Sequence, residues 1–229
     1  MISNQKIYFD NGSTSFPKAP GVATAMANLI EHGAFNINRG NYEGAYEVAA
    51  IVLETRELLA DLFHAKSSKQ VVFTPGITYS LNFVIKGLLK PGDHVLVTGL
   101  EHNAVMRPLC QMEKMGVTYE IVPTDREGMV RVSDVEAMIR KETKAVIMLH
   151  ASNVCGTVVP IEEIGAVCKT YGAYFIVDTA QSAGTLPIDM QKSNIDFLAF
   201  TGHKDLLALP GVGGLIGREN FKIKPLIQG

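Results

Sequence analysis

Polar residues capable of chemistry gather directly after apolar runs of the chain, and Lys204 is the most informative of them. It follows the run "DFLAFTG" (196–202), and apolar residues resume at 206–209. Lysine is almost never fully buried without a partner, and removal from water lowers its pKa and makes the amine a nucleophile toward carbonyl groups. Alternatively, the side chain extends from the strand end and keeps its ammonium group in water.

Two other residues in such positions, Asp178 and His102, could do acid–base chemistry. Asp178 ends the run "AYFIVD" (173–178), where a buried carboxylate needs a cation or several hydrogen-bond donors. It could equally cap a helix that begins in "TAQSAG", where Gln181 stands at a capping-box position or contacts a ligand. His102 could be a catalytic acid or base, a metal ligand or a polar loop residue. The histidines show no metal-binding spacing, so we expect no metal site.

An anion-binding site is suggested by Thr78, which begins a helical pattern after a strand and a Pro-Gly pair. Free N–H groups at a helix start favour an anion, although Thr78 could also be an ordinary first-turn residue. Asn153 follows "LHAS" and either contacts a ligand or only forms a turn. A nucleophilic lysine, a buried acid, an imidazole and an anion-binding helix start together match the needs of pyridoxal 5'-phosphate (PLP).

Alternating apolar runs and helical patterns predict the elements that place these residues. We expect strands at 71–74, 94–99, 117–122, 144–150, 173–178, 196–202 and 212–217, and helices at 44–65, 77–89, 103–115, 133–141 and 160–172. Ser133 and Glu136 have the spacing of a capping box for the fourth helix. Strands that are apolar throughout are typical of parallel sheets covered on both faces. The predicted fold class is α/β, a three-layer α/β/α domain with a mainly parallel sheet of about seven strands, in which ligands bind beyond the carboxyl ends of the strands.

The overall composition restricts the class of partner. The 229 residues are 47% hydrophobic and 19% charged, with a formal net charge of -2 and no run of like charge. This balance argues against binding to nucleic acid or a membrane surface, and no apolar run is long enough to span a bilayer. The first ten residues lack a signal-peptide pattern, so we expect a cytoplasmic protein. We interpret Cys110, Cys155 and Cys168 as buried or incidental thiols, because their number is odd and their spacing fits no metal site.

Several longer stretches match one family in order along the chain. They read "YFDNGSTSFP", "FTPGITYSLN", "LEHNAVMRPL", "HASNVCGTVVPI", "VDTAQSAG" and "FTGHK". Together they resemble the class V aminotransferase family, in particular its cysteine desulfurase-like branch. The resemblance extends over essentially the whole chain and implies a PLP-dependent enzyme of fold type I that forms a homodimer.

The resemblance also implies a role for each candidate residue. Lys204 would form a Schiff base with PLP and shuttle the proton at the substrate Cα, while Asp178 would pair with the pyridine nitrogen. His102 would stack on the ring and move protons. The further cofactor contacts implied are Thr78, Thr201 and His203 at the phosphate, with Ile77 beside them, and Asn153 and Gln181 near the phenolic oxygen.

The implied activity is desulfuration of cysteine to alanine, with the sulfur passing to an enzyme cysteine beyond this chain and a sulfur-acceptor protein as a further partner. Alternatives are another class V aminotransferase, a selenocysteine lyase-type enzyme, and a non-catalytic fragment of the PLP fold that serves as an interaction module. We divide the chain into an N-terminal segment (1–20) and a PLP-binding large domain (21–229).

Two departures from the family pattern affect these expectations. The sequence given stops at "KPLIQG", where the family continues into a small C-terminal domain with the substrate-carboxylate arginine and the loop of the sulfur-accepting cysteine. We therefore expect that this chain alone does not complete desulfuration. After Lys204, Ala208 and Leu209 stand where the family usually has Gly-Pro, so we expect a reshaped loop, because alanine resists backbone geometries open to glycine.

Overall fold

Seven strands form a single sheet in the computed structural model, which describes residues 7–37, 40–221 and 223–228. The strands are β1 (Val71–Thr74), β2 (His94–Thr98), β3 (Thr118–Val122), β4 (Thr143–Leu149), β5 (Tyr174–Asp178), β6 (Phe197–Thr201) and β7 (Gly213–Gly217). Their order across the sheet is β1-β7-β6-β5-β4-β2-β3. The five strands from β6 to β3 run parallel, and β7 pairs antiparallel with both β6 and β1.

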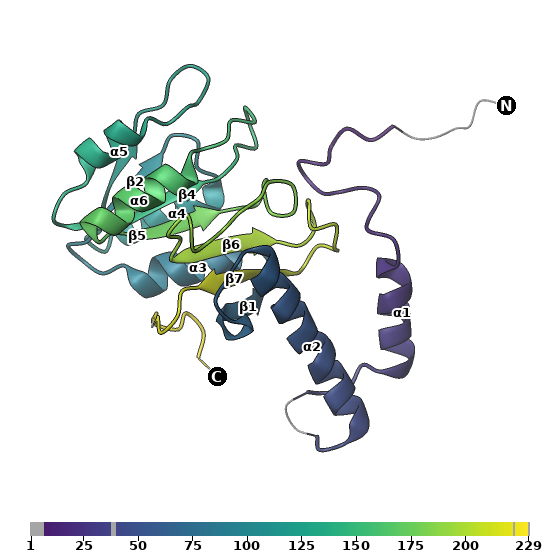
Figure 1. The fold of residues 1–229 in the computed structure, drawn as a ribbon. Coiled ribbons are helices and arrows are strands. Elements are labelled where there is room, and N and C mark those ends of the chain that lie inside the picture. The colour runs from purple at the N-terminus through teal and green to yellow at the C-terminus, as the bar shows by residue number, and fades with distance from the viewer. Residues whose placement is uncertain (1–6, 38–39, 222, 229) are drawn as a thin grey trace.

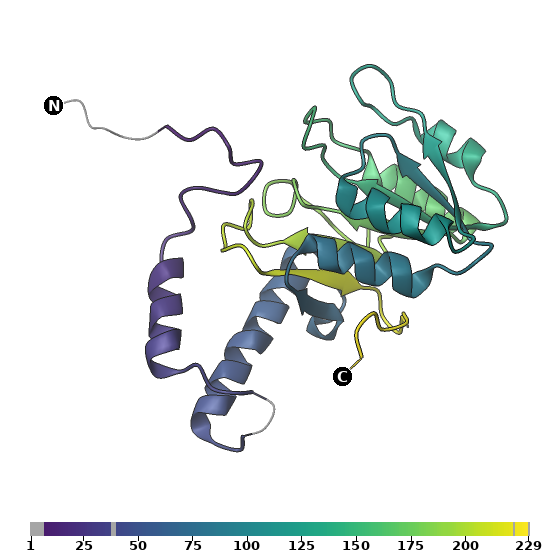
Figure 2. The same cartoon turned by 180° about the vertical axis from the view of Figure 1, so that it is seen from behind.

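Helices cover both faces of this sheet (Figures 1 and 2). The described helices are α1 (Val22–His32), α2 (Glu43–Leu62), α3 (Ile77–Leu88), α4 (Asn103–Glu113), α5 (Val132–Met138) and α6 (Ile161–Tyr171), with a short 3-10 helix η1 (Ser68–Gln70), and those from α3 to α6 cover the sheet. Apolar residues of α5, α6 and the end of α2 pack in the core on one face, and those of α3 and α4 pack on the other. Strands β2 and β6 are buried along their whole length and β5 from Phe175 onward, because both faces are covered. The predicted three-layer α/β/α fold class is confirmed.

The start of α5 differs from the prediction. The helix begins at Val132 with Arg131 as N-cap, and no side chain caps it. Ser133 is therefore inside the first turn, so its hydroxyl group does not take the cap position. The Glu136 carboxylate instead accepts a hydrogen bond from the Tyr171 hydroxyl group at 3.0 Å. The predicted Ser133 capping box is wrong, because a tertiary contact with α6 takes the side chain that the box requires.

The first two helices extend away from the sheet (Figure 1). None of the residues of α1 is buried, and α1 lies outside the elements predicted from the sequence. In α2 only Ala45 and Ala60 are buried, while Ile51 and Leu58 are exposed. Within the described ranges, no helix is both long and apolar enough to cross a membrane.

The segment before α1 is tied to the loop that carries Lys204. Four donors converge on one acceptor, the carbonyl oxygen of His203: the Ser15 N–H at 2.9 Å, the hydroxyl groups of Thr14 and Ser15 at 2.9 and 3.1 Å, and the Lys18 Nζ at 3.1 Å. The Ala19 N–H also donates to the Leu207 carbonyl at 3.2 Å. These bonds hold the backbone on both sides of Lys204.

Replacing Lys18 by methionine tests this tie. Methionine keeps the length of the side chain but removes the ammonium donor from the His203 carbonyl, so we expect faster hydrogen exchange at residues 203–208. We also expect a loss of about 1 kcal/mol in the free energy of unfolding, because the lost bond is charge-assisted but partly exposed. Lys69→Met, on the exposed face of η1, is the matched control. Unchanged exchange in Lys18→Met would show that the tie does not hold the loop.

Candidate functional site

A pocket lies at the carboxyl ends of β4, β5 and β6, where a mainly parallel sheet binds its ligands. Its lining consists of Ile77, His102, Leu149, Ala151, Asn153, Asp178, Ala180, Gln181 and Lys204. Most of the predicted site residues therefore lie together, although they come from distant parts of the sequence. Thr78, Thr201 and His203 are outside this lining and adjoin it through their chain neighbours or a second cavity.

Asp178 provides a buried carboxyl group at the end of β5, where it is 4% exposed. Its Oδ1 accepts a hydrogen bond from the Ala180 N–H at 2.8 Å. Burial raises the pKa of Asp178, whereas the nearby charges of His102 and Lys204 favour its ionised form. The Ala180 bond stabilises a turn after β5, since residues 180–182 form a turn and not the helix that Asp178 would cap in one of the two sequence interpretations. Asp178 also lines the pocket.

Lys204 lies half-buried three residues beyond the end of β6. Burial lowers the pKa of its ammonium group, and the carboxylates of Asp178 and Asp205 partly offset this effect. In such surroundings a larger fraction of the lysine is a neutral amine than would be the case in water, and the neutral amine is the nucleophile. The half-buried position of Lys204 lies between the two sequence interpretations, a buried amine and a side chain that keeps its ammonium group in water.

His102 stands at the N-cap of α4 and is exposed. Its Nδ1 accepts a hydrogen bond from the Ala104 N–H at 3.1 Å. Because Nδ1 is the acceptor, a neutral ring carries its hydrogen on Nε2. The helix start fixes the ring at the rim of the pocket.

The start of α3 offers backbone donors beside the pocket. Within the described chain, no side chain caps α3. Gly76 precedes the helix with a φ of 157°, and a Cβ on Gly213 of β7 would lie 2.8 Å from the Gly76 Cα. Two glycines thus let β7 pass close to the helix start. Ile77 lines the pocket, while Thr78 is exposed and lines a neighbouring cavity that also includes His102.

Thr201 and His203 precede Lys204, at the end of β6 and in the loop that follows it. Thr201 ends β6, is 3% exposed and pairs with Gly213 across the sheet. The Nδ1 atom of His203 is buried and has no hydrogen-bond partner among the described residues. Burial lowers the pKa of His203, as do the charges of Lys204 and Lys18. Leu207, in the loop after Lys204, has a left-handed φ of 57°. It directly precedes Ala208 and Leu209, which stand where the family usually has Gly-Pro.

No role was predicted for Glu101, which lies at the same carboxyl edge of the sheet as the pocket. Its Oε1 accepts hydrogen bonds from the Thr98 hydroxyl group at 2.7 Å and the Leu149 N–H at 3.2 Å. Burial raises the pKa of Glu101 to about 8, and the charge of Asp178 acts in the same direction. Glu101 stands three residues after the end of β2 and directly before His102. Because polar residues that follow a parallel strand lie where ligands bind, this position could have identified Glu101 as a site residue.

The three cysteines are free thiols, of which only Cys168 is buried. Cys155 lies on the loop after β4, two residues from Asn153 of the pocket. Hydrogen bonds with Ser152 and Thr157 lower the pKa of the Cys155 thiol to about 7. This value was not foreseen from the sequence, since it depends on how the loop folds.

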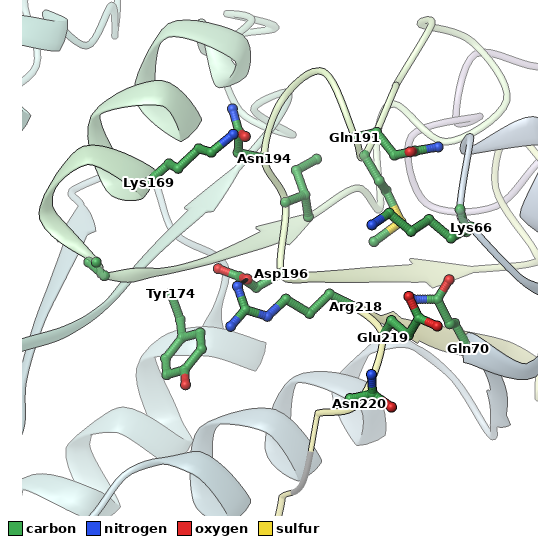
Figure 3. A pocket seen from close by; sticks show the side chains of 15 residues that line it. Lys66, Gln70, Lys169, Tyr174, Gln191, Asn194, Asp196, Arg218, Glu219 and Asn220 are labelled. Atoms are coloured by element: carbon green, nitrogen blue, oxygen red, sulfur yellow. Dashed lines mark ion pairs between the residues drawn. The ribbon is translucent and has the colours of Figure 1, made fainter.

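A larger cavity, about 620 Å³, lies elsewhere (Figure 3). It lies beside Tyr174 at the amino end of β5, and the ion pair of Arg218 Nη1 with Asp196 Oδ1, 2.8 Å long, forms part of its wall. Lys66 and Gln70 line the opposite side. None of the residues predicted for the site lines this cavity, so its size is no guide to the chemistry.

Comparisons with known proteins identify the family of the chain. The family model for class V aminotransferases matches residues 7–229. The cysteine desulfurase IscS of Dictyoglomus turgidum is 34% identical over 229 residues, which are 98% of this chain and 57% of the relative. The cysteine desulfurase IscS of Methanosarcina thermophila is 34% identical over 235 residues, covering 99% of this chain and 56% of the relative.

Solved structures of similar proteins have the same fold. The apo structure of a cysteine desulfurase from Thermococcus onnurineus NA1 superposes with a TM-score of 0.92 at 36% identity, over 97% of this chain and 56% of that one. SspA in complex with cysteine superposes with a TM-score of 0.91 at 31% identity, over 98% of this chain and 65% of that one. The chain thus spans somewhat more than half the length of the relatives it matches. Through the family model, which covers nearly all of its residues, the chain belongs to the class V aminotransferase family.

Proposed function

We propose that this chain forms the cofactor-binding part of a PLP-dependent cysteine desulfurase. Class V aminotransferases are PLP-dependent, and the relatives reported above are named cysteine desulfurases. The observation that carries the proposal is that Lys204 and Asp178 line one pocket at the carboxyl edge of the sheet. There the pKa of the amine is lowered by burial and that of the carboxyl group is raised by burial.

The residues present fit PLP. The Asp178 carboxyl group is buried with the Ala180 N–H as its hydrogen-bond donor in the described chain, so its ionised form gains from a further cationic donor such as a pyridinium N–H. The uncapped start of α3 favours a phosphate group. Lys204 supplies an amine for the aldehyde. These three groups are the minimum that PLP chemistry needs from a protein.

The remaining site residues serve orientation in this proposal. Thr78, Thr201 and His203 hold the phosphate, with Ile77 next to them at the start of α3. Asn153 and Gln181 approach the phenolic oxygen. His102 covers one face of the ring, since the N-cap bond to Ala104 fixes its imidazole at the rim of the pocket.

When bound, PLP supplies an electron sink that withdraws electrons from the bonds at the Cα of an amino acid. Asp178 keeps a negative charge near the ring nitrogen, and this stabilises the protonated ring. Lys204 accepts the proton from Cα and returns it, because its lowered pKa brings the amine closer to the working pH. Cysteine as substrate is supported by the names of the relatives and by the cysteine complex of SspA.

Several finer expectations stay predictions. The chain covers 57% of the length of the relative from Dictyoglomus turgidum, so the substrate-binding arginine and the sulfur-accepting cysteine belong to the part of such enzymes that it does not match. Three further expectations also stay predictions: a large domain formed by residues 21–229, a sulfur-acceptor protein as partner, and a cytoplasmic location. Homodimer formation is supported by exposed apolar side chains on α1 and α2, namely Met26, Ile30, Ile51, Leu53 and Leu58.

The role of Lys204 is tested by adding PLP to the purified protein. We expect a visible absorption band that Lys204→Ala abolishes, because the amine that bonds to the aldehyde is lost. Borohydride reduction of the wild-type protein should leave the cofactor mass on the peptide that contains Lys204. Lys66→Ala, in the larger cavity, is the matched control and should keep the band.

A wild-type protein that takes up no PLP, or a reduced adduct on another lysine, would contradict the assignment. With the complete gene product and L-cysteine, release of sulfide and alanine supports desulfuration. Formation of a keto acid without sulfide would instead identify another class V enzyme, and no turnover of any amino acid would favour a non-catalytic module.

The role of Asp178 is tested by Asp178→Asn. The amide cannot offer a negative charge to the ring nitrogen, so we expect the Kd for PLP to rise by about 10- to 100-fold, as for loss of a buried charge-assisted hydrogen bond. Fluorescence titration with PLP measures the change. Asp134→Asn, on α5, is the control and should bind like the wild type. Equal affinity of wild type and Asp178→Asn would exclude the charge pairing.

A further inference from the structure

Only one of the two oxygens of the Glu101 carboxyl group has hydrogen-bond partners among the described residues. Its Oε1 accepts hydrogen bonds from the Thr98 hydroxyl group at 2.7 Å and the Leu149 N–H at 3.2 Å. Its Oε2 is buried and has no hydrogen-bond partner among the described residues. A buried carboxylate oxygen without a donor is costly, and a neutral carboxylic acid in the same place costs less, because a buried charge is penalised more than an uncharged polar group. Since Oε1 already receives two donors, a proton on this group belongs on Oε2.

The carboxyl group of Glu101 lies close to the strand that ends in Asp178. Glu101 bonds to the N–H of Leu149, and Leu149 is the register partner of Asp178 between β4 and β5. The His150 N–H, one residue on, donates to the Asp178 carbonyl at 2.9 Å. Repulsion from the charge of Asp178 acts in the same direction as burial and raises the pKa of Glu101. Two buried acids in such a position do not both ionise readily.

The surroundings decide which acid keeps the charge. Asp178 is attracted to the charges of His102 and Lys204, and its Oδ1 accepts from the Ala180 N–H. Glu101 accepts hydrogen bonds from two neutral donors, the Thr98 hydroxyl group of β2 and the Leu149 N–H of β4. The negative charge is therefore more stable on Asp178 than on Glu101.

We propose that Glu101 is a positioning residue that stays a neutral carboxylic acid and so leaves the negative charge of the acid pair on Asp178. The consequence for PLP rests on the proposed function, in which that charge faces the ring nitrogen. A merely structural role, that of joining β2 to β4 through Thr98 and Leu149, would be served by either protonation state. The protonation state is therefore the quantity to measure.

The first experiment uses the protein without PLP, so that it does not depend on the proposed function. Carboxyl carbons of ¹³C-labelled glutamate are titrated by NMR between pH 4 and 9, with Glu101→Gln to assign the signal and Glu113→Gln on the exposed side of α4 as control. We expect Glu101 to titrate near pH 8 and to titrate at a lower pH in Asp178→Asn, because the repelling charge is gone. Titration near the ordinary pKa of glutamate, or no change in Asp178→Asn, would overturn the proposal.

The second experiment measures the Kd for PLP by fluorescence titration at pH 7. Glutamine reproduces the protonated acid, with an oxygen acceptor and an N–H donor in the same places. Glu101→Gln should weaken binding less than threefold, against tenfold or more for Asp178→Asn. A loss in Glu101→Gln as large as in Asp178→Asn would show that Glu101 acts as an anion. If no variant and no wild-type protein binds PLP, the proposed function fails while the NMR result still decides the state of Glu101.

Discussion

The site depends on one electrostatic constraint, the burial of the Asp178 carboxyl group beside the amine of Lys204. Each of these groups is unstable as an ion in an apolar environment, and each partly stabilises the charge of the other. The pKa of Asp178 is raised by burial and that of Lys204 is lowered by it, so both groups lie closer to neutrality than they would in water. A parallel sheet with helices on both faces creates this situation, because its strands end inside the covered layer. A pair of this kind is stable when a ligand with a cationic donor and a carbonyl group joins it.

Much of this arrangement could be predicted from the sequence because its causes are local. Uninterrupted apolar runs mark the buried strands, and the residue that follows each run is placed at the carboxyl edge whatever the loops do. For this reason Asp178, His102 and Lys204 could be expected in one site, and the pocket includes all three. The same rule places Glu101 there, although a carboxyl group next to a histidine carries no sign of its protonation state.

Other features depend on contacts between distant residues and could not be predicted. The Ser133 capping box has the correct spacing, but Glu136 bonds to Tyr171, 35 residues away. The Lys18 Nζ and the Thr14 hydroxyl group reach the His203 carbonyl across 185 and 189 residues of sequence. The lowered pKa of the Cys155 thiol results from the fold of its loop. Local propensity does not predict such pairings, because they form only when the N-terminal segment and the loops pack against the rest of the fold.

The central claim is that PLP binds at the carboxyl edge of the sheet with its ring nitrogen on Asp178, and not in the larger cavity beside Arg218. A crystal structure of the protein grown with PLP tests it most directly. We predict continuous density from the Lys204 Nζ to the cofactor and a ring nitrogen about 2.8 Å from an Asp178 oxygen, the usual length of a charge-assisted bond. Density for PLP in the cavity between Lys66 and Arg218, or a ring nitrogen out of reach of Asp178, would contradict the account.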